Sequence, residues 1–353
     1  MSTTANAAEA TEKNEAVTAV PPERADAELL EANGLVKRFP LKRTIFDAML
    51  HKERKALTAV DDVSLTLAQG ETLGLVGESG CGKSTLARTI INLYRPTEGK
   101  VVFDGTDLAS LSKRELRERC GDIQMIFQDP YSSLNPRMTV RQVLREVLLH
   151  RGVCERDKVD AEVMRLLGLV GLSEDQADRL PSAFSGGQRQ RIGIARALAA
   201  RPKLIIADEP VSALDVSIQA QIINLLIDLK ERLDLSILFI SHDLRVVRYI
   251  SDRVAVMYLG SIVETATTDE LYDHPLHPYT KTLLEAAPSM EESRVKETKT
   301  FAKGELPSPI NMPSGCRFHP RCPYATERCK TERPCLRDAG DGHLVACHNP
   351  LEG

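Results

Sequence analysis

A glycine-rich segment directly after a short apolar run restricts the fold of this chain most strongly. Residues 77–84 read GESGCGKS, after the apolar run Leu73 to Val76 and before a helical pattern that starts at Thr85. Glycines let successive backbone N–H groups turn inward, and a helix N-terminus beside them favours negative charge. The segment therefore predicts a strand, a phosphate-binding loop and a helix in that order. The alternative, a glycine-rich turn without function, does not explain this order.

The residues of the loop have distinct expected roles. Lys83 would neutralise the β- and γ-phosphates of a nucleotide. The hydroxyl of Ser84 would bind Mg²⁺, a hard cation that prefers oxygen ligands and usually keeps several waters. The other predicted nucleotide contacts in the loop are Gly77, Ser79, Gly80, Cys81, Gly82 and Thr85.

Two carboxylates follow a second apolar run. Asp208 and Glu209 come directly after Leu204 to Ala207, and ligands of open α/β sheets bind at the carboxyl ends of strands. We expect Asp208 to hold Mg²⁺ through water. Glu209 is expected to accept a hydrogen bond from the attacking water, as general base or water-positioning residue. The alternative is an acidic pair that only caps the next helix or lies in a solvated turn.

Length and charge narrow the class of protein. The 353 residues allow one large domain with appendages, and 42% hydrophobic residues suffice for a sizeable core. The net charge of −4, from 46 basic and 50 acidic residues, provides no overall basic field, so we expect no nucleic-acid partner. No stretch approaches the roughly 18 consecutive apolar residues that span a bilayer. Membrane contact is therefore expected only through a partner.

The chain divides into four predicted parts. Residues 1–30 are acidic and poor in hydrophobic residues, which predicts a disordered leader, and they lack the order of a secretory signal, which predicts a cytoplasmic chain. Residues 31–273 alternate β-type runs with helical patterns, which predicts an α/β domain with a largely parallel sheet and a helical insertion at about 139–184. A short helix and a linker are expected at 274–312, and a Cys-rich tail at 313–353. The β-type runs are Leu73 to Val76, Ile123 to Phe127, Leu204 to Ala207, Ile237 to Ile240 and Val254 to Met257.

Residues 185–191, SGGQRQR, closely resemble the signature loop of ATP-binding-cassette (ABC) ATPases. A serine at a helix start followed by two glycines also makes a second anion site with close backbone approach. Taken with the phosphate loop and with Asp208 and Glu209 in this order, the resemblance implies an ABC ATPase nucleotide-binding domain. Its expected fold has a RecA-like parallel sheet core, an antiparallel β part and a helical signature subdomain.

The resemblance assigns further roles. Gln128 resembles the glutamine that senses Mg²⁺ and contacts the membrane subunits, and His242 resembles the switch histidine that contacts the γ-phosphate. A strand-end histidine that caps the next helix is the alternative for His242. Phe39 stands where the family stacks an aromatic ring on adenine, with a core phenylalanine as the alternative.

Two domains of this family associate head to tail, so the resemblance also implies a dimer. Ser185 and Gly187 would then contact ATP bound by the partner, and residues 212–215, SALD, resemble the dimer-contact loop. The remaining predicted nucleotide contacts of this group are Gly186, Gln188 and Asp215.

Two stretches, 128–136 (QDPYSSLNP) and 274–280 (HPLHPYT), resemble the ATPase subunits of bacterial oligopeptide and dipeptide permeases. The resemblance implies a peripheral ATPase at the cytoplasmic face of the inner membrane. Its expected partners are two membrane-spanning subunits, a second and paralogous ATPase, and indirectly an external binding protein. Related importers carry glutathione, nickel or sugars, and a soluble ABC ATPase that acts on DNA or ribosomes is the alternative from another class.

Five of the eight cysteines lie in the tail, which has little apolar periodicity and so predicts a metal as its cross-link. The tail lacks the C-x₂-C spacing common in zinc sites and resembles the cluster-binding extension of peptide-importer ATPases. That resemblance implies a [4Fe-4S] cluster on Cys316, Cys322, Cys329 and Cys347, with Cys335 as the alternative fourth ligand. Zn²⁺ held by three cysteines and His319, His343 or His348 stays open.

Overall fold

The computed structural model describes residues 28–41, 56–119, 121–129, 131, 134–286, 307–308 and 310–352. The predicted leader up to residue 27 and the predicted linker at 287–306 lie outside the described residues. Residues 130, 132 and 133 of the stretch 128–136 also lie outside them.

The strands form two sheets. An antiparallel four-stranded sheet has the order β2-β1-β4-β5, and an eight-stranded mixed sheet has the order β11-β12-β10-β9-β3-β8-β7-β6. The strands of the first sheet are β1 (Glu28–Pro40), β2 (Ala56–Ala68), β4 (Glu98–Phe103) and β5 (Thr106–Asp107). Those of the second are β3 (Thr72–Val76), β6 (Ile123–Ile126), β7 (Leu204–Asp208), β8 (Ser236–Ile240), β9 (Arg253–Tyr258), β10 (Ser261–Thr267), β11 (Arg337–Asp338) and β12 (Leu344–Val345).

Five neighbouring strands of the larger sheet, β9-β3-β8-β7-β6, run parallel. Each comes from one of the five apolar runs in the sequence, and both faces of this part of the sheet are covered. Along β7, Leu204 and Ile206 pack into one core cluster, whereas Ile205 and Ala207 pack into the other. Buried parallel strands read as continuous apolar runs for this reason, and the predicted α/β class is confirmed, with mixed sheets.

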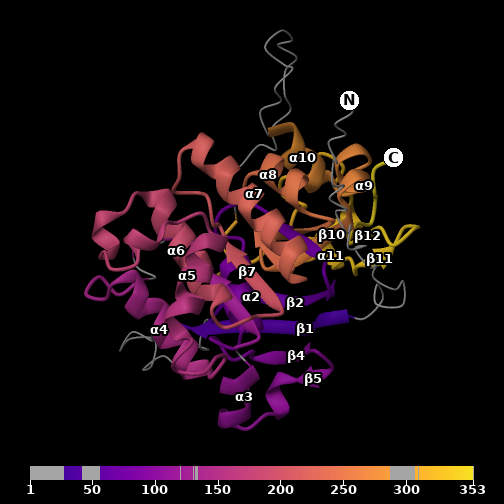
Figure 1. Ribbon diagram of the computed structural model, residues 1–353. Coiled ribbons are helices and arrows are strands. Elements are labelled where there is room, and N and C mark those ends of the chain that lie inside the picture. Colours follow the sequence, from indigo (N-terminus) through magenta and orange to yellow (C-terminus); the bar gives the residue numbers. More distant parts are fainter. Residues whose placement is uncertain are drawn as a thin grey trace, which may run out of the picture.

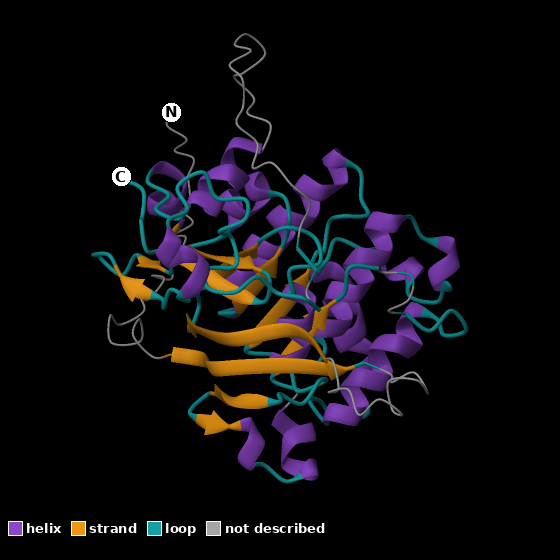
Figure 2. Cartoon of the chain, turned by 180° about the vertical axis from the view of Figure 1, so that it is seen from behind, coloured by secondary structure: helices purple, strands orange, loops and turns teal. Residues whose placement is uncertain are grey.

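Helices cover the sheets as Figures 1 and 2 show. One helix, α2 (Lys83–Ile90), packs against β1, β2 and β7 and shares a core cluster with both sheets. The other core cluster gathers side chains of the helices from α4 to α10. The remaining helices are α3 (Lys113–Arg119), α4 (Val140–Arg151), α5 (Val159–Leu169), α6 (Gly186–Leu198), α7 (Val216–Leu233), α8 (Leu244–Ile250), α9 (Thr268–Asp273), α10 (Pro278–Ala286) and α11 (Glu327–Thr331), with short 3-10 helices η2 (Leu108–Ser110), η3 (Glu174–Gln176) and η4 (Pro181–Ala183).

Residues 139–184 contain only helices, turns and loops. Thr139 begins α4 with a capping box, in which its side chain accepts from the Gln142 N–H and the Gln142 side chain accepts from the Thr139 N–H. Such a box satisfies two backbone donors at a helix start. In Figure 1, α4, α5 and α6 lie together at the side of the molecule opposite β11 and β12.

Two boundaries differ from the predicted ones. Strand β1 begins at Glu28, and Leu29 and Leu30 are buried, so the ordered domain starts before residue 31. The Cys-rich tail contributes β11 and β12 to the main sheet, with Val345 opposite Glu264 of β10. The tail is therefore continuous with the main sheet. Among the described helices, none combines the length and the apolar character needed to cross a bilayer.

Candidate active site

The phosphate loop connects the end of β3 with the start of α2, and its glycines are required by close backbone approach. Gly82 has φ of 113°, and a Cβ there would lie 2.2 Å from the carbonyl oxygen of Ala59. A Cβ on Gly77 would lie 2.2 Å from the carbonyl oxygen of Met257. Neither contact is sterically possible, so only glycine fits at these two positions.

Lys83 is buried inside the loop. Its ammonium donates to the carbonyl oxygens of Gly77, at 2.7 Å, and Glu78, at 3.1 Å. Cys81 is also buried, and burial raises the pKa of its thiol. The loop therefore holds its one cation at the centre of a ring of backbone, where a phosphate group would accept from it.

A cavity of about 290 Å³ opens beside the loop and brings most of the predicted site together. Asp208 does not line it, but this residue, 2% exposed, accepts a hydrogen bond of 2.8 Å from the hydroxyl of Ser84, which does. Burial raises the pKa of the Asp208 carboxyl. The predicted residues that line the cavity are Ser79, Gly80, Cys81, Gly82, Lys83, Ser84, Thr85, Gln128 and Glu209, joined by Leu57, Thr58, Ala59, Leu259 and Gly260.

Glu209 lies between the two side chains that the resemblance assigned to the same site. The Gln128 amide donates to Glu209 Oε2 at 3.0 Å, and His242 Nδ1 lies 3.4 Å from Glu209 Oε1. Glu209 has φ of 47°, an unusual value for a residue with a side chain. Such conformations cluster at functional sites, and this one lies where β7 has just ended.

The signature residues form a helix start. Ser185 Oγ accepts from the Gln188 N–H at 3.3 Å, and Gln188 Oε1 accepts from the Ser185 N–H at 3.0 Å. A Cβ on Gly187 would lie 2.5 Å from Cγ2 of Ile218 in α7, so α6 and α7 approach closely there. Of the described residues that line the 290 Å³ cavity, none is Ser185, Gly186, Gly187, Gln188 or Asp215. Within one chain, these residues therefore do not contribute to the cavity beside the phosphate loop.

Phe39 lies elsewhere on the four-stranded sheet. Its ring meets Tyr94 edge to face, with centroids 5.4 Å apart, and the ammonium of Lys37 lies 5.1 Å from its centroid. It does not line the 290 Å³ cavity within the described part of the chain. The stacking of Phe39 on adenine stays a prediction.

Four tail cysteines line one small cavity with a free volume of about 10 Å³. These are Cys316, Cys322, Cys329 and Cys347, the four predicted cluster ligands. Burial raises the pKa of Cys322 and of Cys347 to about 11, and the neighbouring thiols act in the same direction. The described cysteines are free thiols.

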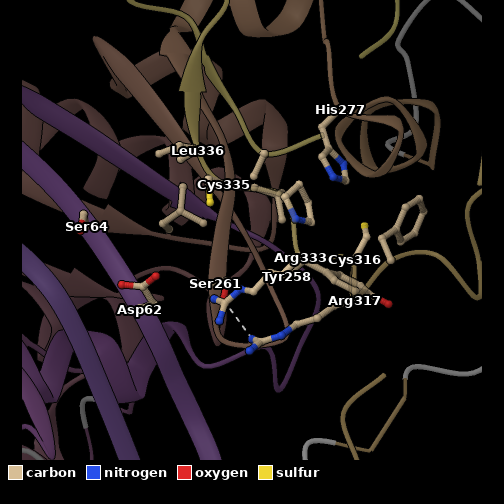
Figure 3. A pocket seen from close by; sticks show the side chains of 15 residues that line it. Asp62, Ser64, Tyr258, Ser261, His277, Cys316, Arg317, Arg333, Cys335 and Leu336 are labelled. Carbon is tan, nitrogen blue, oxygen red and sulfur yellow. Dashed lines mark hydrogen bonds between the residues drawn. The ribbon is translucent and has the colours of Figure 1, made fainter. Parts of the chain in front are cut away.

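Cys335 lies outside this group. It is exposed and lines a neighbouring cavity of about 430 Å³, shown in Figure 3, which Asp62 and Ser64 of β2 also line and which shares Cys316 with the thiol cavity. In that cavity Arg317 and Arg333 both donate to Ser261, each at 2.9 Å, and both pair with Asp61. These contacts attach the tail to the two sheets.

Of the three histidines considered as zinc ligands, two line the thiol cavity and one does not. His319 and His348 line the thiol cavity, whereas His343 is buried against Glu264, with 2.7 Å between Nε2 and Oε1. Among the described residues, no group of three or more histidine, cysteine or acidic side chains is arranged to hold a metal ion. The four thiols therefore share a cavity without being drawn together around a single centre.

One cavity residue was missed by the sequence analysis. His277, in the HPLHPYT stretch, is buried and lines the thiol cavity, and its Nδ1 accepts from the Tyr279 N–H at 3.0 Å. This leaves the proton on Nε2, which is buried and has no hydrogen-bond partner within the described structure. The two prolines that frame this histidine were its only signal in the sequence.

Comparison with known proteins agrees with these features. The family profile described as ABC transporter matches residues 60–212, and the profile described as oligopeptide/dipeptide transporter, C-terminal region, matches residues 263–329. The oligopeptide transport ATP-binding protein AppF of Bacillus subtilis is 53% identical, over 91% of this chain and 97% of that protein. The probable peptide ABC transporter ATP-binding protein y4tS of Sinorhizobium fredii is 52% identical, over 91% of this chain and 89% of that protein.

Solved structures show the same fold. The dimeric post-hydrolysis state of the ATP-binding cassette MJ0796, bound to ADP and phosphate, has a TM-score of 0.59 and 29% identity. It covers 68% of this chain, and this chain covers 98% of it.

Proposed function

The chain belongs to the family of ATP-binding proteins of oligopeptide and dipeptide ABC transporters, and we propose that it hydrolyses ATP to energise the uptake of short peptides. One observation carries the proposal. Residues 79–85 of the phosphate loop, Gln128 and Glu209 line a single cavity, and Asp208 and His242 contact two of these lining residues, Ser84 and Glu209.

The proposed chemistry assigns each group a task. The loop N–H groups and Lys83 bind the phosphates. Ser84 and Asp208 would supply oxygen donors of the kind that Mg²⁺ prefers, and they already lie together, with 2.8 Å between the hydroxyl and a carboxylate oxygen. When bound, Mg²⁺ neutralises charge that develops on the phosphoryl oxygens. The Gln128 side chain, with its amide on Glu209, keeps its carbonyl oxygen for the metal.

Glu209 and His242 are proposed to complete the reaction. Glu209 accepts a proton or a hydrogen bond from the attacking water, and His242 supports that carboxylate and contacts the γ-phosphate. The left-handed backbone of Glu209 directs its carboxylate into the cavity, where the water must stand. The amide of Gln128 and the ring of His242 then limit its rotation.

We also propose a head-to-tail dimer. Ser185, Gly187 and Asp215 do not reach the nucleotide cavity of their own chain, so a second cassette is needed to use them. The similar protein MJ0796 is described as dimeric. The proposed partners are a paralogous ATPase and two membrane-spanning permease subunits at the cytoplasmic face of the membrane, with an external binding protein that delivers the peptide.

For the tail we propose a four-thiolate metal centre on Cys316, Cys322, Cys329 and Cys347, with [4Fe-4S] preferred and Zn²⁺ as the alternative. The support is the donor set, since four soft ligands from separate turns of the tail, between Cys316 and Cys347, line one cavity. Its free volume is about that of one water molecule. Either metal would require the thiol side chains to rearrange, because no group of three or more histidine, cysteine or acidic side chains in the described part of the chain is arranged to hold a metal ion.

Purification from membranes tests the transport role. The tagged chain, extracted in mild detergent, is expected to carry two multi-span proteins and a second cassette ATPase. Recovery of ribosomes or DNA instead contradicts the proposal. Cells that lack the chain should lose uptake of labelled di- to pentapeptides, and loss of glutathione, nickel or sugar uptake with normal peptide uptake would change the proposed cargo.

A further inference from the structure

The Cys-rich tail touches the phosphate loop directly. Arg321 lies between Cys316 and Cys322, and its guanidinium forms a two-pronged ion pair with the carboxylate of Glu78, with both N–O distances 3.0 Å. The two residues are 243 positions apart in sequence. Their side chains are 10% and 27% exposed, respectively, so water screens the pair only in part.

A second contact fixes the same loop residue from its backbone side. The hydroxyl of Tyr279 in α10 accepts a hydrogen bond of 2.9 Å from the Glu78 N–H. Tyr279 is fully buried, and burial raises the pKa of its hydroxyl, which therefore stays neutral. Glu78 is thus held through both its backbone and its side chain by residues outside the loop.

Aromatic packing joins these two contacts to the thiol cavity. Tyr279 packs on Phe318, with ring centroids 5.4 Å apart, and Tyr258 packs on both rings, at 4.5 and 5.4 Å. Phe318 also lines the thiol cavity. One side of this aromatic group therefore faces the phosphate loop and the other faces the cysteines.

Backbone hydrogen bonds connect Arg321 to the segments that carry the cysteines. The Arg321 N–H donates to Phe318 O at 2.9 Å, and the His319 N–H donates to Cys316 O at 3.0 Å. The Cys316 N–H in turn donates to Cys329 O at 2.8 Å. Displacement of Cys316 or Cys322 must therefore move the guanidinium on Glu78, because only short turns separate them.

We propose that Arg321 is a positioning residue for the nucleotide site, and that through Glu78 it couples the order of the Cys-rich tail to ATP affinity. A two-pronged pair with a carboxylate specifies direction as well as distance, so it fixes Glu78 and with it the inward N–H groups of the loop. Coupling between sites is reciprocal. Nucleotide binding accordingly stabilises the tail. This inference goes beyond the proposed transport role, since it holds for any cargo and for either metal.

The test measures equilibrium binding of Mg-AMP-PNP, a non-hydrolysed ATP analogue, to the full chain. Arg321→Met is expected to weaken binding about 5- to 20-fold, within the usual range of coupling between sites. Arg328→Met is the matched control, because Arg328 lies in the same tail and pairs with the exposed Glu332 instead. The control should stay within about twofold of the wild type.

A double-mutant cycle separates the contact from general damage. Glu78→Gln should weaken binding as Arg321→Met does, and the double variant should be no weaker than either, because one interaction is removed only once. Arg321→Lys should restore part of the affinity. If Arg321→Met does not fold, the nucleotide affinities of Arg321→Lys and Glu78→Gln test the same contact. Wild-type affinity in these variants, or additive losses, overturns the inference.

Hydrogen exchange tests reciprocity with an independent readout. AMP-PNP should slow amide exchange in residues 316–329 of the wild type and of Arg328→Met, but not of Arg321→Met. Equal slowing in all three overturns the inference. Wild-type protein that does not bind AMP-PNP at all would instead contradict the proposed ATPase role, so the two failures are distinguishable.

Discussion

The side-chain amide of Gln128 donates a hydrogen bond to the carboxylate of Glu209, with 3.0 Å between Nε2 and Oε2, although 81 positions separate them in sequence. The contact exists because β6 and β7 are parallel neighbours, so the residues that follow them leave the sheet at the same edge. A movement of the loop that carries Gln128 therefore changes the position of the carboxylate proposed to act on water.

Glu209→Gln should lower ATP turnover by at least about 100-fold and leave ATP binding intact, because the amide keeps the shape of the side chain but not its basicity. Steady-state phosphate release and equilibrium nucleotide binding measure the two effects. Glu231→Gln, on the exposed surface of α7, is the control. Normal turnover in Glu209→Gln would disprove the proposed role.

Two glycines of α6 should respond in opposite ways to alanine. Gly187→Ala places a methyl group 2.5 Å from Ile218 and should destabilise the fold by about 1–3 kcal/mol. Gly193→Ala meets no atom within 4 Å and should stabilise the helix by about 0.5–1 kcal/mol. Urea unfolding measures both. Equal effects would contradict the close approach of α6 and α7.

Glu264→Gln should destabilise the chain by about 1–3 kcal/mol. The carboxylate is fully buried and accepts from the Leu276 and His277 N–H groups at 2.6 and 3.0 Å, and it also bonds His343. The side-chain amide of a glutamine would point its own N–H group at one of these N–H donors, so a hydrogen bond would be lost. Glu270→Gln, with a 48% exposed side chain, should change stability by less than about 0.5 kcal/mol in the same thermal unfolding measurement.

Metal content should separate Cys335 from the other tail cysteines. Cys335→Ser should keep the metal of the wild type, because this exposed thiol lines a different cavity. Cys329→Ser and Cys347→Ser should lose most of it, because both thiols line the shared cavity. Iron, acid-labile sulfide and zinc per chain are measured after anaerobic purification. If Cys335→Ser loses its metal, Cys335 replaces Cys347 as the proposed fourth ligand.

The candidate nucleotide site could be predicted from the sequence because each of its parts is a local pattern. A glycine loop between a strand and a helix is specified by about a dozen adjacent residues, and Asp208 and Glu209 follow one apolar run. The five parallel strands were readable for the same reason, since strands buried on both faces have continuous apolar sequences.

The features of the fold that could not be predicted from the sequence depend on contacts between residues far apart in the chain. The strands β11 and β12 have two residues each, too few for any periodic pattern, and they exist because β10 offers an edge. The pairing of Arg321 with Glu78 and the position of Cys335 outside the cavity of the four other tail thiols likewise follow from how the tail docks. Hydrophobic patterning describes each segment but not which segment it meets.

The position of β11 and β12 has a consequence for the solubility of the whole subunit. Strand β10 would be the last strand of the main sheet without them, and an open edge of this kind pairs readily with another chain. Strand β12 covers that edge opposite Glu264 and Thr265, and the sheet then ends at the exposed strand Arg337–Asp338, whose charges discourage further pairing. Removal of the tail is therefore expected to expose this part of β10 to pairing with another chain, whether or not the tail binds a metal.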